Sequence, residues 1–217
     1  MNRFEKEAPT WDEAPQRKVL TSAITNALFD AIHLTKNQLA LDYGAGTGLI
    51  TLEIAQKVKH IVAMDSSVGM LGVLKEKIQH YQIPNISTEL LDLEKSTLDR
   101  HFDVIFSSMT MHHIDEPLKL INVFMDALNP NGILAIADLD TESGHFHADN
   151  NGVKHFGFDR AIWEKRFLEM GLSNVHTQTA YTFQKETPNG TKETFSIFLI
   201  WGFHMVKYTH TFGEAHS

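Results

Sequence analysis

Cysteine is absent from this 217-residue chain, so no disulfide bond contributes to its stability. The N-terminal residues 1–7 contain no apolar core of the kind that a secretory signal requires, and we therefore expect a cytoplasmic protein. Long hydrophobic runs are also missing. The longest apolar stretch, Ile197 to Phe203, is far too short to cross a bilayer and predicts a buried strand instead, so no membrane association is expected.

Clusters of basic residues are missing as well. The chain has 19 Lys and Arg against 27 Asp and Glu, which gives a formal net charge of -8, and its basic residues are scattered. Binding to nucleic acid requires clustered positive charge, so we expect no nucleic-acid partner and a small neutral or cationic substrate instead. No internal repeat or linker interrupts residues 1–217, which predicts one domain; monomer and homodimer both stay open.

The most informative segment is Leu39-Ala-Leu-Asp42-Tyr-Gly44-Ala-Gly46-Thr-Gly48, in which an apolar strand enters a glycine-spaced turn. Such glycines let the backbone approach a nucleotide-like ligand closely, although the same pattern also occurs in plain tight connections. A carboxylate at Asp42 would repel a pyrophosphate, and the third glycine of a dinucleotide fingerprint is replaced by Leu49. The segment therefore favours S-adenosylmethionine, which carries an ammonium, a sulfonium and no phosphate, over NAD(P).

Two further apolar runs end in acids. Residues 61–65 end at Asp65, about twenty residues after the glycine turn, where a ribose-binding carboxylate belongs in this fold class, and Ser66 follows it. The run 86–91 is followed by Asp92 and Leu93, which would place a polar and an apolar group at an adenine edge. Three strands thus end in acids at one edge of the predicted sheet.

These motifs, together with Phe102-Asp-Val-Ile-Phe-Ser107 and Leu128-Asn-Pro-Asn-Gly132-Ile-Leu-Ala-Ile-Ala-Asp138, resemble in order those of the class I S-adenosylmethionine-dependent methyltransferases, over residues 35–140. The small single-domain enzymes of that family often have an N-terminal stretch like Ala8-Pro-Thr-Trp11-Asp12. The resemblance implies a role for each motif. It assigns the methionine end to Asp42, Gly44, Ala45, Gly46 and Gly48, the ribose to Asp65 and Ser66, the adenine to Asp92 and Leu93, the neighbourhood of the methyl group to Ser107, and a cap over the cofactor to Trp11.

Helical periodicity predicts helices over 16–32, 67–81 and 159–171, and a fourth that begins at Asp115-Glu-Pro117 and is closed by Asn131-Gly132. Strands are predicted over 175–183 and 195–203, joined through Pro188-Asn-Gly190. The fold is therefore α/β, a doubly wound, mostly parallel sheet of seven strands with a C-terminal antiparallel hairpin. We divide it into an N-terminal arm and covering helix (1–34), a cofactor-binding core (35–140), a lid (141–158) and a C-terminal helix and hairpin (159–217).

The segment 141–158 is long for a strand-to-helix connection and holds several histidines and phenylalanines. It follows the fifth strand at the edge where ligands bind in such sheets, so we interpret it as a lid, with an ordered surface loop as the alternative. The residues expected to face the substrate are Met109, His145, His147, His155 and Phe158. A metal site built from His145, His147, His155 and Asp140 is conceivable, but these residues form no compact ligand motif and we expect no metal.

His112 and His113 follow the fourth strand, where the loop faces the transferring methyl group in this architecture. Either histidine could act as general base for a hydroxyl, amine or thiol; packing or capping at a helix start beside Asp115 is the alternative. The sulfonium is already an activated leaving group, so no covalent nucleophile is needed. The sequence predicts methyl transfer to a small molecule by in-line displacement, with a non-catalytic S-adenosylmethionine-binding module or an NAD(P)-dependent oxidoreductase as alternatives.

Overall fold

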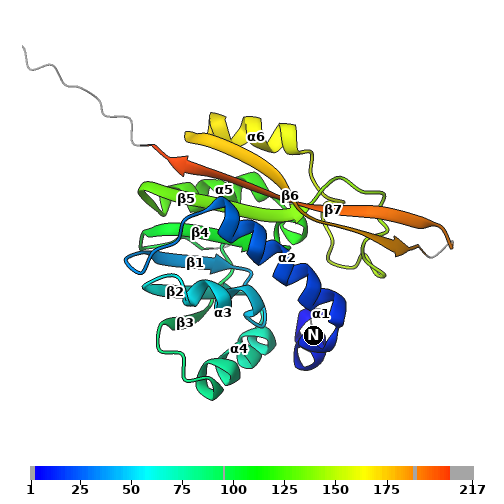
Figure 1. The fold of residues 1–217 in the computed structure, drawn as a ribbon, viewed down its shortest axis with the longest axis horizontal. Coiled ribbons are helices and arrows are strands. Elements are labelled where there is room, and N and C mark those ends of the chain that lie inside the picture. The colour runs from blue at the N-terminus through cyan, green and yellow to red at the C-terminus, as the bar shows by residue number, and fades with distance from the viewer. Residues whose placement is uncertain (1–2, 95, 188–189, 206–217) are drawn as a thin grey trace, which may run out of the picture.

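The computed structural model describes residues 3–94, 96–187 and 190–205, and its centre is one sheet of seven strands in the order β3-β2-β1-β4-β5-β7-β6 (Figure 1). Strands β1 to β5 pair in parallel, whereas β7 runs antiparallel between β5 and β6. The strands are β1 (Leu39–Tyr43), β2 (His60–Asp65), β3 (Ile86–Leu90), β4 (Phe102–Ser108), β5 (Leu128–Leu139), β6 (Leu172–Glu186) and β7 (Lys192–His204). This confirms the predicted sheet and its antiparallel hairpin, whose predicted turn residues Pro188 and Asn189 lie outside the described residues.

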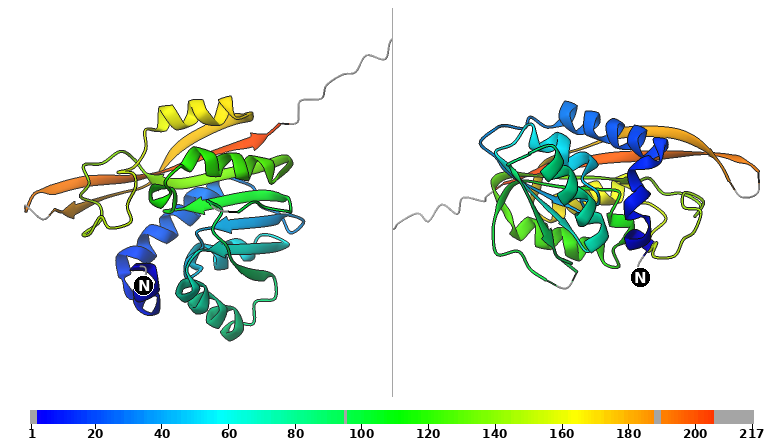
Figure 2. Two further views of the ribbon diagram at one scale, coloured as in Figure 1. Left: turned by 180° about the vertical axis from the view of Figure 1, so that it is seen from behind. Right: turned by 90° about the horizontal axis from the view of Figure 1, so that it is seen from below.

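Helices cover both faces of the sheet (Figure 2). Helices α2, α3 and α4 pack on one face and α5 and α6 on the other, while α1 and the 3₁₀ turn η1 lie beside α4. The bounds are α1 (Arg3–Glu7), η1 (Ala8–Glu13), α2 (Pro15–Ala31), α3 (Leu49–Ala55), α4 (Val68–His80), η2 (Met111–His113), α5 (Pro117–Asp126) and α6 (Arg160–Glu169). Within the described part of the chain, none of these helices combines the length and the apolar character that a membrane span requires.

Local chemistry accounts for the helix starts that the sequence predicts. Pro15 and Pro117 stand in the first turns of α2 and α5, where the missing N–H costs nothing. At α4 the Ser67 hydroxyl accepts a hydrogen bond from the backbone N–H of Met70, and Asp159 caps α6 in the same way. These caps bring the observed helices within two residues of most predicted boundaries.

The predicted end of α5 at Asn131-Gly132 is wrong. The helix ends at Asp126, and β5 begins at Leu128 and includes Asn131, which adopts a left-handed backbone with φ of 62°. Asparagine tolerates this conformation, and here it accompanies a shift of register between β4 and β5 rather than a helix cap. The hairpin strands are also longer than predicted, because both continue beyond the body of the sheet (Figure 1).

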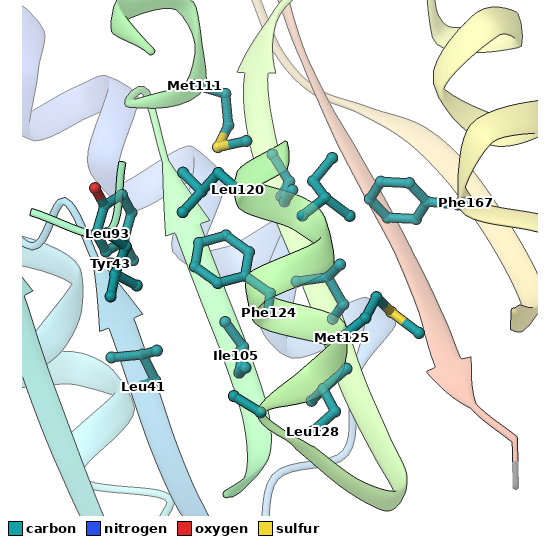
Figure 3. Close-up of a cluster of buried hydrophobic side chains, with 14 of the residues drawn as sticks. Leu41, Tyr43, Leu93, Ile105, Met111, Leu120, Phe124, Met125, Leu128 and Phe167 are labelled. Carbon is teal, nitrogen blue, oxygen red and sulfur yellow. The ribbon is translucent and has the colours of Figure 1, made fainter. Parts of the chain in front are cut away.

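The core on the α5 side is built around Phe124, whose side chain is fully buried. Its ring meets that of Tyr43 edge to face, with centroids 5.5 Å apart, and Figure 3 shows it between α5 and the strands β1 and β4. Leu120 and Met125 extend the same apolar face of α5. This packing fixes the carboxyl ends of β1 and β4 relative to each other.

Replacing Phe124 by alanine should lower the free energy of unfolding by about 3–5 kcal/mol, because the cavity cannot collapse in a sheet packed on both faces. Urea unfolding followed by circular dichroism measures the change. Phe156→Ala is the matched control, since 47% of the surface of that phenylalanine is exposed and its truncation should cost far less. Equal losses for both variants would contradict this description of the core.

Candidate functional site

A cleft of about 410 Å³ opens at the carboxyl ends of the parallel strands β1, β2 and β4, on the side of the molecule where α1 and the loops after β5 lie (Figure 1). Its size is within the range of small-molecule and cofactor sites. Residues of the N-terminal arm and α2, of three strand ends, and of the loops after β4 and β5 line it. Those used below are Phe4, Trp11, Arg17, Asp42, Gly44, Ala45, Gly46, Asp65, Ser66, Asp92, Glu94, Ser108, Met109, Thr110, His113, Gly152 and Lys154.

The turn after β1 brings bare backbone to the cleft. The backbone N–H groups of Gly44 and Ala45 both donate to the carbonyl of Met64, at 2.8 and 3.0 Å, which ties this turn to β2. A Cβ on Gly44 would come within 2.1 Å of the Thr110 hydroxyl, and φ is 74°. Only glycine fits there, because the Thr110 side chain fills the space that a Cβ would need, and the predicted contact of Gly44 with a ligand stays a prediction.

Asp42 lies at the end of β1, is 2% exposed, and borders the cleft. Its Oδ2 accepts a hydrogen bond of 2.6 Å from the hydroxyl of Thr51 on α3. Burial, together with the nearby charge of Asp65, raises the pKa of this carboxyl from 3.8 to about 7. A carboxylate that is costly to ionise in the empty cleft would be stabilised by a cationic ligand beside it.

Asp65, at the end of β2, holds the neighbouring turns together. Its two carboxylate oxygens accept hydrogen bonds of 2.8 Å from the backbone N–H groups of Gly46 and Ser67. Burial raises its pKa, although the bonds from Ser67 and Gly46 act against that change. The backbone N–H of Ser66 bonds to it as well, so three of the about four acceptor sites of this carboxylate are used and one is left for a hydroxyl in the cleft.

The cleft brings together many of the residues predicted from the sequence, and the others, all within the described ranges, are not part of its lining. The lining includes Trp11, Asp42, Gly44, Ala45, Gly46, Asp65, Ser66, Asp92, Met109 and His113. The residues outside the lining are Gly48, Leu93, Ser107, His112, His145, His147, His155 and Phe158.

The placement of Ser107 beside the methyl group is corrected by the structure. Its side chain is fully buried, and its hydroxyl donates to the backbone carbonyl of Tyr43 at 2.9 Å. Successive residues of a strand point to opposite faces, so it is the adjacent Ser108 that lines the cleft. Leu93 is likewise a core residue, 3% exposed and packed in the same cluster as Tyr43.

Three of the predicted substrate residues of the segment 141–158 make structural contacts instead. Phe158 packs on Trp163 with ring centroids 4.5 Å apart, and the Nε2 of His155 is 3.0 Å from the carbonyl of Ile114. His145 pairs with Glu193, at 2.8 Å between Nδ1 and Oε1. Their side chains are therefore used to hold the loop on the body of the protein.

The same segment is also anchored through its backbone. Thr141 and Glu142 donate to the carbonyls of Phe158 and Phe156, and the N–H groups of 154 and 155 both donate to the carbonyl of His112. Gly152 and Lys154 reach the cleft from this segment. It thus forms part of the cleft wall, and its opening as a lid stays a prediction.

The N-terminal arm is attached to the cleft by interactions that the sequence did not predict. The sequence pointed to the arm only through the stretch that contains Trp11 and Asp12. Glu5 accepts hydrogen bonds from the Ser67 hydroxyl and the Gly69 N–H, at 2.7 and 2.8 Å, which lower its pKa. Asp12 accepts a 2.6 Å hydrogen bond from Thr47 and pairs with Lys77. The arm is therefore fastened both to α4 and to the glycine turn.

Arg17 shapes the cleft from α2. Its guanidinium lies 3.6 Å from the centroid of the Trp11 ring and donates to the carboxylate of Glu7 at 2.7 Å. The stacking orients Trp11 at the cleft, where Phe4 also lies, with its ring centroid 5.9 Å from that of Trp11. An aromatic wall thus faces the strand ends.

His112 and His113 occupy different environments. His112 is 1% exposed, and its Nδ1 lies 2.7 Å from Asp138, whereas His113 borders the cleft, with its Nδ1 2.9 Å from the carbonyl of Gly152. Burial lowers the pKa of His113 to about 4, and the adjacent His112 contributes to that shift. Burial likewise lowers the pKa of His147 to about 3. Both rings are therefore neutral at pH 7.

The four residues that the sequence offered as metal ligands, Asp140, His145, His147 and His155, do not come together. His145 and His155 have the partners given above, and Asp140 pairs with Arg160. Another set is assembled instead. One ring nitrogen from each of His112, His113 and His147 lies within 4.8 Å of the other two. His112 and His147 are 35 residues apart, so only the folded chain could reveal the cluster.

Comparison with known proteins places these features in a family context. A family model described as a methyltransferase domain matches residues 34–187. An uncharacterized methyltransferase of Schizosaccharomyces pombe is 35% identical over 151 residues, which cover 62% of this chain and 53% of that protein. The trans-aconitate 2-methyltransferase of Deinococcus radiodurans is 28% identical over 180 residues, covering 79% and 66% respectively. This chain spans about half the length of the first curated relatives that it matches.

A solved structure shares the fold. It is that of a phosphoethanolamine N-methyltransferase 2 from Haemonchus contortus in complex with phosphomonomethylethanolamine and S-adenosylhomocysteine. It has a TM-score of 0.68 and 15% sequence identity, and the match covers 84% of this chain and 52% of that one. At this identity the likeness shows the fold alone.

The buried carboxylate of Asp42 should make the stability of the ligand-free protein depend on pH. The folded-state pKa of about 7 exceeds the unfolded value of 3.8. The contribution of the protonated carboxyl to the free energy of unfolding is therefore fully present below about pH 4 and is lost as the pH rises through 7. Asp42→Asn can still accept the Thr51 hydrogen bond. Between about pH 4 and pH 8 its free energy of unfolding should fall by up to about 4 kcal/mol less than that of the wild type.

Urea unfolding over that pH range gives the measurement. Asp126→Asn is the control, because Asp126 is exposed on α5 and its replacement should leave the pH profile unchanged. Asp65, whose pKa is also raised, should retain part of the pH dependence in the Asp42 variant. Identical profiles for wild type and Asp42→Asn would show that Asp42 does not carry this cost.

Proposed function

The chain belongs to the methyltransferase-domain family, which confirms the resemblance to class I methyltransferases, and we propose that it transfers a methyl group from S-adenosylmethionine to a small-molecule acceptor. The family match covers residues 34–187 and so includes the glycine turn and all three acidic strand ends. The similarity to a trans-aconitate 2-methyltransferase and to a phosphoethanolamine N-methyltransferase supports a small acceptor. When bound, S-adenosylmethionine supplies the electrophilic methyl group.

The observation that carries the proposal is the acidic character of the cleft. Asp42, Asp65, Asp92 and Glu94 line it. The basic groups at its edge are engaged elsewhere, since Arg17 pairs with Glu7 and Lys154 with Asp115. A cofactor with an ammonium and a sulfonium is attracted by this field, whereas the pyrophosphate of NAD(P) is repelled.

Each end of the cofactor has matching groups in the cleft. Asp42 and the turn Gly44-Ala45-Gly46 would hold the methionine end, where a Cβ on Gly46 would meet nothing within 4 Å and the backbone is open to the cleft. Asp65, whose carboxylate borders the cleft, would accept a hydrogen bond from the ribose, and Asp92 would contact the adenine. Trp11 and Phe4 would cover the bound molecule and exclude water.

The acceptor would lie beside Met109, Thr110 and His113, which follow β4, and Gly152, which belongs to the loop after β5. The Nδ1–H of His113 donates to the carbonyl of Gly152, so its Nε2 is a free acceptor for a hydroxyl or amine proton. His112 packs on His113 with ring centroids 4.1 Å apart, has Asp138 and His147 within hydrogen-bond distance of its ring nitrogens, and would not contact the acceptor. The alternative is a binding module without turnover.

S-adenosylhomocysteine should raise the melting temperature of the protein, and NAD should not, because only the former presents an ammonium to Asp42. Differential scanning fluorimetry at equal ligand concentrations tests this expectation. A second assay measures whether S-adenosylhomocysteine is formed from S-adenosylmethionine when small acceptors, trans-aconitate among them, are added. Its formation distinguishes an enzyme from a binding module. A shift with NAD alone would overturn the cofactor assignment, and binding without turnover of any acceptor would favour the module.

Asp65→Asn should weaken S-adenosylhomocysteine binding by about 1.5–3 kcal/mol through loss of a charge-assisted hydrogen bond to the ribose. Asparagine is preferred to alanine because Asp65 also accepts backbone N–H bonds, and the amide oxygen keeps at least one of them. Isothermal titration calorimetry provides the affinity, with Asp126→Asn as the exposed control. An unchanged affinity would remove Asp65 from the binding site.

A further inference from the structure

Three histidine rings converge immediately behind the cleft, and their hydrogen bonds determine which nitrogens face one another. The Asp138 carboxylate, which is fully buried, accepts from the Nδ1–H of His112 and also from the backbone N–H of Leu139, at 2.7 Å each. The carbonyl of Gly152 accepts from the Nδ1–H of His113 at 2.9 Å. Both rings therefore carry their proton on Nδ1 and present a bare Nε2.

His147 completes the group from the loop after β5. Its Nε2 is 3.0 Å from the Nε2 of His112, and its ring centroid is 5.4 Å from that of His113. The loop holds this ring in place, because the adjacent Phe146 packs on Phe195 with centroids 5.8 Å apart and its carbonyl accepts a 2.7 Å hydrogen bond from Lys185. The histidine cluster of His112, His113 and His147 is thus built from two separate segments that are both anchored.

We propose that His112, His113 and His147 bind one divalent transition-metal ion of the zinc type at the rear wall of the cleft. One ring nitrogen from each lies within 4.8 Å of the others, and tetrahedral ligation at Zn–N distances of about 2.0–2.1 Å requires nitrogens about 3.3 Å apart. One pair of nitrogens is 3.0 Å apart and no pair is more than 4.8 Å apart, so the rings would have to adjust to reach that spacing. A three-histidine set leaves a fourth position for water or an oxygen ligand.

The partners behind the rings support a metal rather than a chance contact of histidines. Metal-bound histidines characteristically donate their other N–H to a carboxylate or a backbone carbonyl, which fixes the tautomer and the ring orientation. His112 has the carboxylate of Asp138 and His113 has the carbonyl of Gly152 in these roles. Asp138 would also supply a negative charge 2.7 Å from a ligand ring, which compensates part of the charge of the ion.

The surroundings also favour one class of metal. All three ligands are imidazole nitrogens with no carboxylate oxygen among them, and the positive charges of Arg3 and Lys185 near His147 oppose a cation, against the carboxylate of Asp138 beside His112. Hard cations such as Mg²⁺ or Ca²⁺ need oxygen ligands and would be rejected, whereas Zn²⁺, Co²⁺ and Ni²⁺ bind imidazole. Because His113 borders the cleft, the ion would adjoin the place proposed for the acceptor, and it would occupy the His113 Nε2 that only the metal-free protein offers as a proton acceptor.

Isothermal titration of the metal-stripped full chain with Zn²⁺ tests the site, and the visible absorption of bound Co²⁺ reports its geometry. We expect one tightly bound Zn²⁺ per chain, a tetrahedral Co²⁺ spectrum and no binding of Mg²⁺. His147→Ala should weaken Zn²⁺ binding at least about tenfold and abolish that spectrum, and Asp138→Asn should weaken it about 10–100-fold. Circular dichroism establishes that the variants are folded.

His145→Ala is the matched control, because it removes a histidine from the same loop, two residues away, whose Nδ1 pairs with Glu193 instead. This variant should bind Zn²⁺ like the wild type. The proposal is overturned if the wild type binds no Zn²⁺ or if His147→Ala leaves Zn²⁺ binding unchanged; the cluster is then a hydrogen-bonded histidine group only. Neither outcome depends on S-adenosylhomocysteine binding. The metal site and the cofactor assignment can therefore fail independently of each other.

Discussion

The burial of a carboxylate at the carboxyl end of β1 is the constraint on which the cleft depends. Asp42 lies at the point where the chain leaves the sheet, and it can be kept there because Thr51, in the first turn of α3, donates a hydrogen bond to it. The same turn requires Gly44, since a Cβ there would collide with Thr110. Backbone access and negative charge are therefore produced by one short segment, and together they favour a cationic, nucleotide-like ligand over a phosphate.

The rest of the cleft is arranged around that segment. Asp65 joins the glycine turn to the start of α4 through its bonds to Gly46 and Ser67, and the arm joins the same two places through Asp12 and Glu5. A ligand that contacts the turn would therefore also contact groups to which the arm is attached. This connectivity explains how residues near the N-terminus, far from the sheet in sequence, help to form the cleft wall.

Much of this was predictable from the sequence because the signals are local. The glycine turn, Asp42 and Asp65 are read directly from strand ends, and parallel strands bring their carboxyl ends to one edge. Ser107 was misplaced because adjacent residues at the end of a strand point to opposite faces, so a shift of one residue exchanges core and cleft. Leu93 lies in the turn after β3 and packs into the core, which strand ends do not indicate. Asn131 was misread because a left-handed asparagine serves a bulge as well as a helix end.

The histidine cluster could not be predicted, because it depends on how the loop after β5 folds back on the loop after β4. The sequence showed only adjacent histidines at 112–113 and a histidine-rich stretch at 145–155. Which of those rings meets the pair is decided by packing: Phe146 anchors His147 inward, while Glu193 pairs with His145. Long loops carry few local signals, so such a convergence becomes visible only in the folded chain.

The central claim, that Asp42 selects the cofactor through its ammonium group, is tested most directly by a double-mutant cycle. Calorimetry would compare S-adenosylhomocysteine with its analogue lacking the α-amino group, each bound to the wild type and to Asp42→Asn. We predict a coupling energy of about 1–3 kcal/mol between the carboxylate and the ammonium. Additive effects, with a coupling near zero, would contradict the account and leave the acidic cleft without its proposed ligand.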